Sequence, residues 1–199
     1  MNDNLVYVKG FSSPPVDRTE VMRYARVREN SLEMEKLLDE CIVEAEKQLV
    51  YKTCYTFFDI KIEENEIDLG FARASSKSLI KTFDGCDRIV LFCATIGSGI
   101  DRLIAKNAVI SPARAVILQA LGSERVEALC DELCSYIAEE VGECTGRFSP
   151  GYGDLSLEIQ RDVFASLDPT RRIGVDLGDN LFMQPSKTVT AIIGIKCKL

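Results

Sequence analysis

Histidine and tryptophan are absent from the 199 residues, and basic side chains are outnumbered by acidic ones, 24 to 31. Without histidine the chain lacks the imidazole of Ser-His and Cys-His nucleophile pairs, and it lacks a common metal ligand. The formal charge of −7 repels phosphate, which argues against nucleic acid as a partner. A cationic ligand or a basic protein surface suits this charge better.

Long hydrophobic runs are also missing. The longest apolar stretch, residues 89–100, contains Gly97 and Gly99 and is too short to span a bilayer. The first four residues, Met-Asn-Asp-Asn, show no basic and apolar signal pattern. We therefore expect a cytoplasmic protein without a membrane partner, whose eight cysteines are thiols.

Three of these cysteines lie near one another in the sequence. Cys130 and Cys134 are one helical turn apart and Cys144 follows, so three thiolates could bind zinc or part of an iron–sulfur cluster. The spacing supplies no fourth ligand, and the chain has no Cys-x-x-Cys pair. The pattern favours small apolar residues on a helix face, and we predict no metal site.

The periodicity of apolar residues predicts helices and strands in mixed order within a single domain. Helices are predicted over residues 17–27, 31–50, 75–83, 100–107, 111–140 and 157–166, and strands over 51–62, 67–69, 88–95, 172–177 and 188–197. Asp17 and Glu20 suggest a capping box at the first helix. The strands do not alternate strictly with helices, which favours an α+β fold with a mainly antiparallel sheet and one long helix.

Three parts of the domain are expected. Residues 1–16 are broken by glycine and proline and suggest an N-terminal arm. Residues 17–85 hold three of the predicted helices and a hairpin, and residues 86–199 hold the remaining helices and strands with the loop considered next. Between a strand and a helix of this last part, Gly97-Ser98-Gly99 could cradle a phosphate, but the third glycine of that motif is missing, so a tight turn is favoured.

The most distinctive feature is the loop that runs from Arg147 to Tyr152, Arg-Phe-Ser-Pro-Gly-Tyr. The planar fork of an arginine fits a carboxylate bidentately. A Pro-Gly turn offers backbone groups that could read the edge of an adenine, and a tyrosine ring can cover a flat or cationic ligand. These residues suit an amino-acid-bearing nucleoside, although a plain surface turn with a tyrosine anchor would look the same.

Residues 146–152 resemble the G-x-R-x-x-P-G-Y stretch of the reactivation domains of cobalamin-dependent methionine synthases, with one residue fewer before the arginine. Downstream, residues 173–177 and 182–191 are similar to that family's G-x-x-L-T-E-x-x-x-M-x-P-x-x-S-V-S-G run. Upstream, Glu127-Ala128 resembles the Glu-Ala pair on a family helix.

Residues 19–24 and 93–97 also resemble short stand-alone members of the family, and the resemblance covers mainly residues 86–199. It implies the fold of the reactivation domain, binding of S-adenosylmethionine (SAM), and no catalytic residue of its own. The SAM-binding residues it implies are Arg147 for the methionine carboxylate, Ser149, Pro150, Gly151 and Tyr152 around the adenine, and Glu127 beside the ligand.

Three departures from the family pattern bear on affinity. A family acid six residues before the arginine is replaced by Val141, for which Glu140 or Glu143 could substitute. The N-terminal acidic element has no clear match. Leu199 ends the sequence before the family's late ligand-contacting tyrosine. The departures imply weak SAM binding, or a site that a partner completes.

The implied function is the reactivation subunit of a split methionine synthase in methionine biosynthesis, a component rather than a complete methyltransferase. The chain would hold SAM for reductive methylation of cob(II)alamin on a corrinoid protein, with an electron from flavodoxin or ferredoxin. Because it has no histidine, it lacks the Asp-x-His-x-x-Gly motif by which many corrinoid proteins ligate cobalt. Two alternatives stay open: service to another corrinoid methyltransferase, and a docking scaffold that no longer binds SAM.

Overall fold

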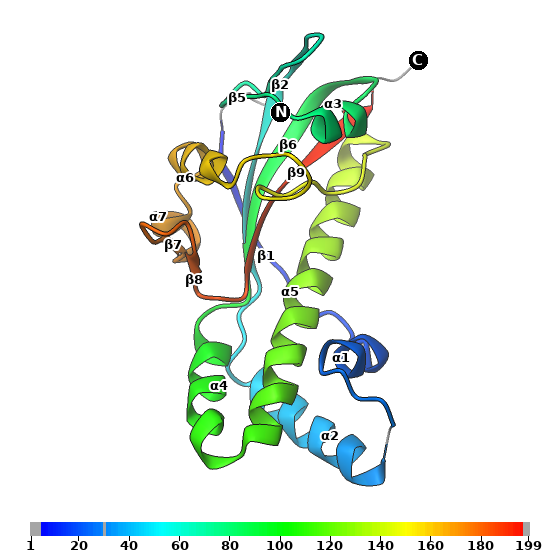
Figure 1. Ribbon diagram of the computed structural model, residues 1–199, viewed down its shortest axis with the longest axis vertical. Helices are drawn as coiled ribbons and strands as arrows, with labels where there is room; N and C mark the ends of the chain where they lie inside the picture. The colour runs from blue at the N-terminus through cyan, green and yellow to red at the C-terminus, as the bar shows by residue number, and fades with distance from the viewer. Residues whose placement is uncertain (1–4, 30, 197–199) are drawn as a thin grey trace.

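The computed structural model describes residues 5–29 and 31–196. A four-stranded antiparallel sheet with the order β1-β2-β6-β9 forms its centre, and a long helix, α5, runs along one face of the sheet (Figure 1). The four strands are β1 (Tyr7–Gly10), β2 (Lys52–Asp59), β6 (Cys86–Thr95) and β9 (Thr188–Lys196). The expected α+β class, with an antiparallel sheet and one long helix, is confirmed.

The remaining elements surround this sheet. The helices are α1 (Arg18–Tyr24), α2 (Leu32–Glu46), α3 (Lys77–Thr82), α4 (Gly99–Ile110), α5 (Pro112–Val141), α6 (Gln160–Leu167) and α7 (Pro169–Ile173), and a 3-10 turn, η1 (Leu157–Ile159), precedes α6. The short strands β3 (Lys61–Ile62), β4 (Ile67–Asp68) and β5 (Arg73–Ala74) form a second sheet, and β7 (Asp176–Leu177) pairs with β8 (Met183–Gln184). Among the described helices, none is both long and apolar enough to cross a bilayer.

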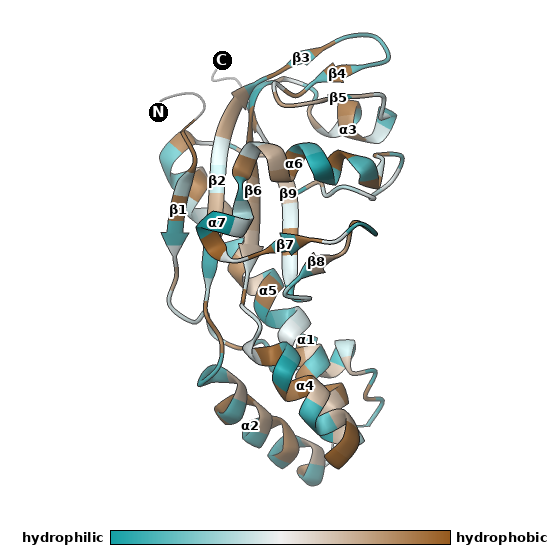
Figure 2. Ribbon diagram, turned by 90° about the vertical axis from the view of Figure 1, so that its left-hand side faces the viewer, coloured by the Kyte–Doolittle hydropathy of each residue, from teal (hydrophilic) through white to brown (hydrophobic). Residues whose placement is uncertain are grey.

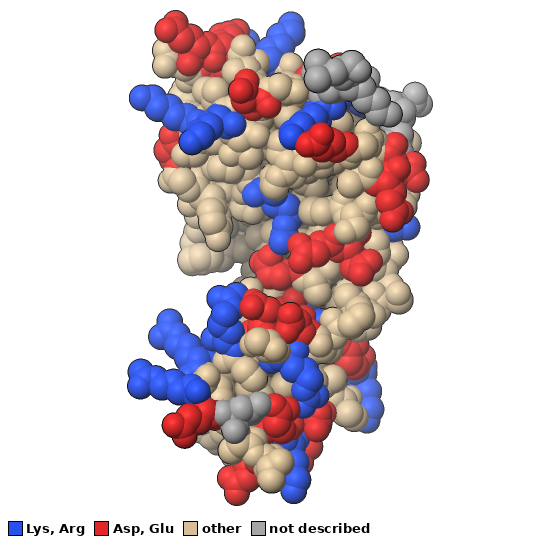
Figure 3. All heavy atoms as spheres, turned by 90° about the vertical axis from the view of Figure 1, so that its right-hand side faces the viewer, with Lys and Arg blue, Asp and Glu red and all other residues tan. Residues whose placement is uncertain are grey.

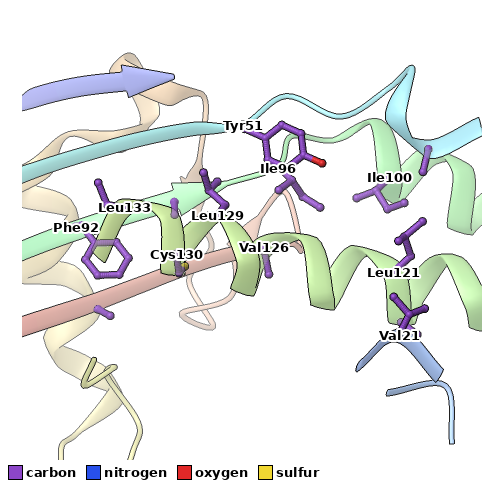
Figure 4. Close-up of a cluster of buried hydrophobic side chains, with 14 of the residues drawn as sticks. Val21, Tyr51, Phe92, Ile96, Ile100, Leu121, Val126, Leu129, Cys130 and Leu133 are labelled. Atoms are coloured by element: carbon purple, nitrogen blue, oxygen red, sulfur yellow. The ribbon is translucent and has the colours of Figure 1, made fainter. Parts of the chain in front are cut away.

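Strand β6 is buried on both faces, which explains its nearly continuous apolar sequence. On the α5 side, Phe92 packs with Leu129, Cys130 and Leu133 of the long helix (Figure 4). On the opposite side, Leu91 joins the cluster beneath α3 and α6, and Figure 2 shows α6 and α7 in front of the strands with α5 behind. Each fully buried side chain of this size contributes about 1.5–3 kcal/mol, so the two layers hold the sheet rigidly between them.

The first half of α5 extends beyond the sheet, where α1, α2 and α4 pack around it (Figure 1). Ser111 and Pro112 begin the helix as expected, with the proline in the first turn, and Gly142 ends it. A single 30-residue helix therefore joins the group of helices α1, α2 and α4 to the sheet.

Two segments differ from the sequence-based expectation. Tyr7–Gly10, expected within an irregular arm, forms the edge strand β1, because its residues pair with 52–55 of β2. Of the strand expected over 172–177, the first two residues instead end helix α7, which has Pro169 in its first turn and is closed by Gly174 in the left-handed conformation. Only Asp176 and Leu177 remain as strand β7, and Cys197, expected to end the last strand, lies outside the described residues.

The start of α1 is tied to α5. Asp17 caps the helix as expected, since its Oδ1 accepts a hydrogen bond from the Glu20 N–H at 3.0 Å. In a capping box the Glu20 carboxylate would accept a hydrogen bond from the Asp17 N–H. Here the Asp17 N–H donates instead to Oε1 of Glu124 on α5 at 3.0 Å, and the Glu20 carboxylate accepts from Arg23. The capping residue of α1 is thereby held against the middle of the long helix.

The corner of residues 97–99 is shaped by packing. Gly97 has a φ of +77°, and a Cβ on Gly99 would lie 2.2 Å from the carbonyl oxygen of Gln48. Asp101, in the first turn of α4, accepts hydrogen bonds from the N–H and hydroxyl of Ser186 at 2.9 and 2.5 Å. A phosphate at this corner would face a carboxylate, so we interpret the two glycines as a close-packed turn.

We expect Gly99→Ala to lower the free energy of unfolding by about 1–3 kcal/mol, because overpacking forces the backbone of Gln48 away. Urea denaturation measures the effect. Gly146→Ala is the matched control, since a Cβ there meets nothing within 4 Å, and it should change stability little. Equal stability of the two variants would contradict the packing argument.

Candidate functional site

The loop after α5 brings Arg147 back alongside the helix. The loop follows strand β9, with hydrogen bonds from the N–H of Thr145 to the Gly194 carbonyl and from the N–H of Phe148 to the Ile192 carbonyl, both 2.9 Å. It runs antiparallel to β9, as the isolated bridge between Phe148 and Ile192 shows. The backbone of Arg147 is therefore positioned by the rigid sheet rather than by the loop alone.

The Arg147 guanidinium lies between two carboxylates of α5. Its Nη2 is 2.8 Å from Oδ1 of Asp131 and 3.1 Å from Oε2 of Glu127. These acids are four residues apart, so they project from the same face of the helix. The arginine side chain is 25% exposed, against 44% for Glu127 and 70% for Asp131. The cation is thus half-buried, and its two partners face solvent.

Residues 149–152 form a tight turn. The Tyr152 N–H donates to the Ser149 carbonyl at 3.1 Å, Pro150 occupies the second position, and Gly151 has a φ of +83° in the third. This is the pattern of a type II turn, which requires a positive φ at that position and so favours glycine there. The Gly151 N–H donates to the carbonyl of Leu155 at 3.0 Å.

The N–H groups of Gly151 and Tyr152 are therefore already bonded within the loop, to the carbonyls of Leu155 and Ser149. Within the described part of the chain, the N–H and the hydroxyl of Ser149 have no hydrogen-bond partner. The donors available to an adenine edge are these two groups of Ser149 rather than the N–H groups of Gly151 and Tyr152.

Asp154 anchors the far end of this loop to α3. Its carboxylate accepts hydrogen bonds from the Ser76 hydroxyl at 2.5 Å, the Lys77 N–H at 2.8 Å and the Ser78 N–H at 3.2 Å. These bonds, the one from Ser76 first, lower the pKa of Asp154 to about 2. The ionised carboxylate is the form that holds the loop.

We expect Asp154→Asn to destabilise the protein at neutral pH. The folded-state pKa lies below the unfolded value, so the contribution of Asp154 is present above pH about 4 and is lost as the pH falls toward about 2. The measurement is urea denaturation of both proteins between these limits. Their difference in stability should shrink on acidification, whereas a constant difference would contradict this role. Asp84→Asn, beyond the other end of α3, is the control.

Three adjoining hollows surround the loop. One of about 620 Å³ lies between the turn and the segment around β8, and its lining includes Tyr152, Leu157 and Phe182. A second, of about 190 Å³, lies between Arg147 and Tyr152. The two share Glu127, Ser149, Tyr152 and Val189, so they join into one groove. Its volume lies in the range of small-molecule sites.

The third hollow continues the groove on the other side of Arg147. It has a volume of about 330 Å³ and shares Glu127 and Arg147 with the second. Carboxylates dominate its lining: Asp17, Glu20, Glu124, Glu127 and Asp131. Figure 3 shows acidic side chains gathered at the waist of the molecule on this side. The groove thus has an apolar end, where the Tyr152 and Phe182 side chains are 72% and 70% exposed, and an acidic end.

The cysteines near Arg147 are thiols buried by packing. Cys130 is fully buried beside Phe92 (Figure 4). Burial raises its pKa well above the usual range despite the nearby arginine, and burial raises the pKa of Cys134 to about 11. Within residues 5–29 and 31–196, no cluster of three or more cysteine or acidic side chains is arranged to hold a metal ion.

The structure brings the residues selected from the sequence into one place. Arg147, Ser149, Pro150, Tyr152 and Glu127 line the groove, and Gly151 shapes the turn without lining it. Sequence reasoning missed Asp131, although its spacing of four from Glu127 on a predicted helix could have revealed it.

The two acids that could have substituted for the family acid at Val141, Glu140 and Glu143, do not line the groove. Glu143 pairs with Lys196, and neither it nor Glu140 lines the described hollows around Arg147. Glu140 is in the last turn of α5 and Glu143 follows the helix. The loop carries Arg147 back alongside α5 to the level of Glu127 and Asp131, more than two turns before the end of the helix.

No known sequence family matches the chain, and no curated protein matches it by sequence. Among solved structures, it is similar to the crystal structure of the MetH reactivation domain bound to AdoHcy. The TM-score is 0.72 at 16% sequence identity, over 98% of this chain and 80% of that chain. The chain is therefore an α+β protein with one long helix against an antiparallel sheet. More particularly, its fold is that of the methionine synthase reactivation domain.

Proposed function

We propose that the chain binds SAM in the groove and presents its methyl group to a corrinoid carried by a partner protein. The observation that carries the proposal is the Arg147 guanidinium, which the β9 pairing and two carboxylates of α5 hold at the junction of the hollows. An arginine fixed in this way can grip a carboxylate bidentately. The similar MetH domain was crystallised with AdoHcy, a ligand that bears such a carboxylate.

Each part of the ligand has a counterpart in the groove. Arg147 takes the methionine carboxylate, and Glu127 and Asp131 beside it take the ammonium. Ser149 supplies donors for the adenine, and the exposed ring of Tyr152 covers the nucleoside at the apolar end. The methyl-bearing sulfur then lies between the two ends, open to a partner that docks over the groove.

The chemistry needs alignment rather than acid or base catalysis. Methyl transfer from a sulfonium to a cob(I)alamin nucleophile involves no proton transfer at the reacting carbon, so a site without histidine suits it. The residues of this chain orient the donor and help to exclude water. The corrinoid and an electron from flavodoxin or ferredoxin come from other proteins, which makes the chain a reactivation subunit of a split methionine synthase.

The first test is calorimetric titration of the purified chain with SAM, with ATP as a control nucleotide. We expect saturable binding of one SAM per chain and no binding of ATP, whose phosphates the acidic end repels. If SAM fails to bind, the titration is repeated with a cobalamin-loaded methionine synthase that lacks its own reactivation domain. Failure in both would contradict the proposal and leave the scaffold hypothesis.

A second experiment separates methionine synthase from another corrinoid methyltransferase as the partner. The truncated synthase, inactivated as cob(II)alamin, is mixed with SAM, reduced flavodoxin and the chain. The absorption spectrum should change to that of methylcobalamin only when the chain is present. Reactivation of a different corrinoid protein, with none of the synthase, would favour the alternative.

A further inference from the structure

A separate hollow lies between α2 and α4, at the end of the molecule away from the sheet (Figure 1). Its volume is about 660 Å³, and it shares no lining residue with the hollows around Arg147. Its apolar lining is Val43 of α2, which is 59% exposed, and Leu103 of α4, which is half-buried. A single exposed valine is ordinary on a protein surface, so the charges around it decide what the hollow can bind.

The charges that line this hollow cancel. Three carboxylates stand against three cations, so the formal charge is zero: Asp39, Glu40 and Glu44 against Lys47, Lys106 and Arg114. The whole chain carries −7. Two copies of an acidic chain repel each other least where the surface is locally neutral, and the hollow is such a surface.

The two charged residues nearest to solvent are placed symmetrically about Val43. Asp39 comes four residues before it and Lys47 four residues after it, so all three lie on the same side of α2. At a rise of 1.5 Å per residue the two charges are about 12 Å apart along the helix, too far to pair within one chain. Within the described part of the chain, Lys47 has no ion-pair partner, and Asp39, 62% exposed, contacts Arg18, which it shares with Glu35.

We infer that this hollow is the contact surface for a second copy of the chain, in a two-fold dimer with the two α2 helices antiparallel. A two-fold axis at the level of Val43 brings Asp39 of each copy opposite Lys47 of the other, which forms two ion pairs across the interface. Val43 of each copy then packs against Leu103 and the hydrocarbon stem of Lys106 in the other. The surface lies away from Arg147, so the inference does not depend on the proposed function.

Sedimentation equilibrium of the purified chain tests the association. We expect the mass to rise from the 22.1 kDa of one chain toward twice that value as the concentration is raised from about 10 to about 500 µM, as a small reversible interface gives. The mass of a single chain over the whole range would overturn the inference and leave the hollow to a different partner or to none.

Val43→Asp should weaken the dimer about tenfold or more, because it places two like charges together at the axis. Val109→Asp is the matched control: Val109 is even more exposed, at 87%, but stands at the end of α4 outside the hollow. It should dimerise as wild type does. A dimer that Val109→Asp disrupts and Val43→Asp leaves intact would lie elsewhere, and the inference would fail.

Exchanging the two charges tests the antiparallel arrangement. Lys47→Asp alone, or Asp39→Lys alone, sets like charges opposite each other across the axis and should weaken the dimer about tenfold or more. The double variant Asp39→Lys with Lys47→Asp restores opposite charges between copies and should dimerise within about threefold of wild type. Since the two residues are too far apart to compensate within one chain, this rescue reports a contact between copies. Circular dichroism shows whether each variant is folded, and a folded double variant without rescue would contradict the arrangement.

Discussion

Replacing Arg147 with alanine is expected to lower SAM affinity by about two orders of magnitude or more. Hydrogen bonds to charged groups contribute about 1.5–3 kcal/mol each, and a bidentate grip on the carboxylate makes two of them. The variant also leaves Glu127 and Asp131 to repel the same carboxylate. Titration of the variant with SAM measures the loss, and Arg147→Lys should recover only part of it because an ammonium has no planar fork.

The fold should survive this substitution, which makes the result interpretable. Glu127 and Asp131 are 44% and 70% exposed, so water solvates them when the guanidinium is gone. Arg114 is the matched control: it also lies between two carboxylates, Glu40 and Glu44, with 21% exposure, but toward the other end of α5. Arg114→Ala should bind SAM as wild type does. A SAM affinity of Arg147→Ala equal to that of Arg114→Ala would mean that the loop is a structural turn.

Replacing Arg125 with alanine is expected to reduce the free energy of unfolding by about 3–5 kcal/mol, the loss seen when one partner of a buried ion pair is removed. Arg125 is fully buried and Glu124 is 4% exposed. The guanidinium donates to both carboxylate oxygens of Glu124 and to the carbonyls of Pro14 and Pro15, at 2.5 to 2.7 Å. Alanine would leave the buried Glu124 carboxylate without a cation, with only the Asp17 N–H as a donor, and it would remove the guanidinium from the two carbonyls.

Two further variants isolate the cause of that loss. The double variant Arg125→Met with Glu124→Gln removes both charges and keeps an acceptor for the Asp17 N–H, so it should be more stable than Arg125→Ala. Arg18→Ala removes an exposed arginine from its pairs with Glu35 and Asp39 and should cost at most about 1 kcal/mol. Urea denaturation compares the four proteins, and a loss below about 1 kcal/mol in Arg125→Ala would contradict the argument.

Local signals in the sequence predicted much of the fold. Ser111-Pro112 and Gly142 bound a helix with continuous apolar periodicity, and the structure has that helix with the expected start and end. The short helix α7 was missed because it has only five residues, from Pro169 to the residue before Gly174, too few to show a period. Strand β1 was missed because a four-residue edge strand is too short to show a pattern of its own. It is defined by its pairing with β2, which lies more than 40 residues away in the sequence.

By itself, the sequence determined the class of fold, the loop at Arg147 and its tight Pro150-Gly151 turn, because helix periodicity, capping and turn chemistry act between residues a few positions apart. Only the tertiary structure decided which carboxylates face Arg147, since that depends on the loop returning along β9 to the level of Asp131 rather than of Glu140 or Glu143. It also decided that Glu124 completes the cap of α1 from 107 residues away. Long-range contacts of this kind depend on how the packed layers meet, and no local pattern encodes them.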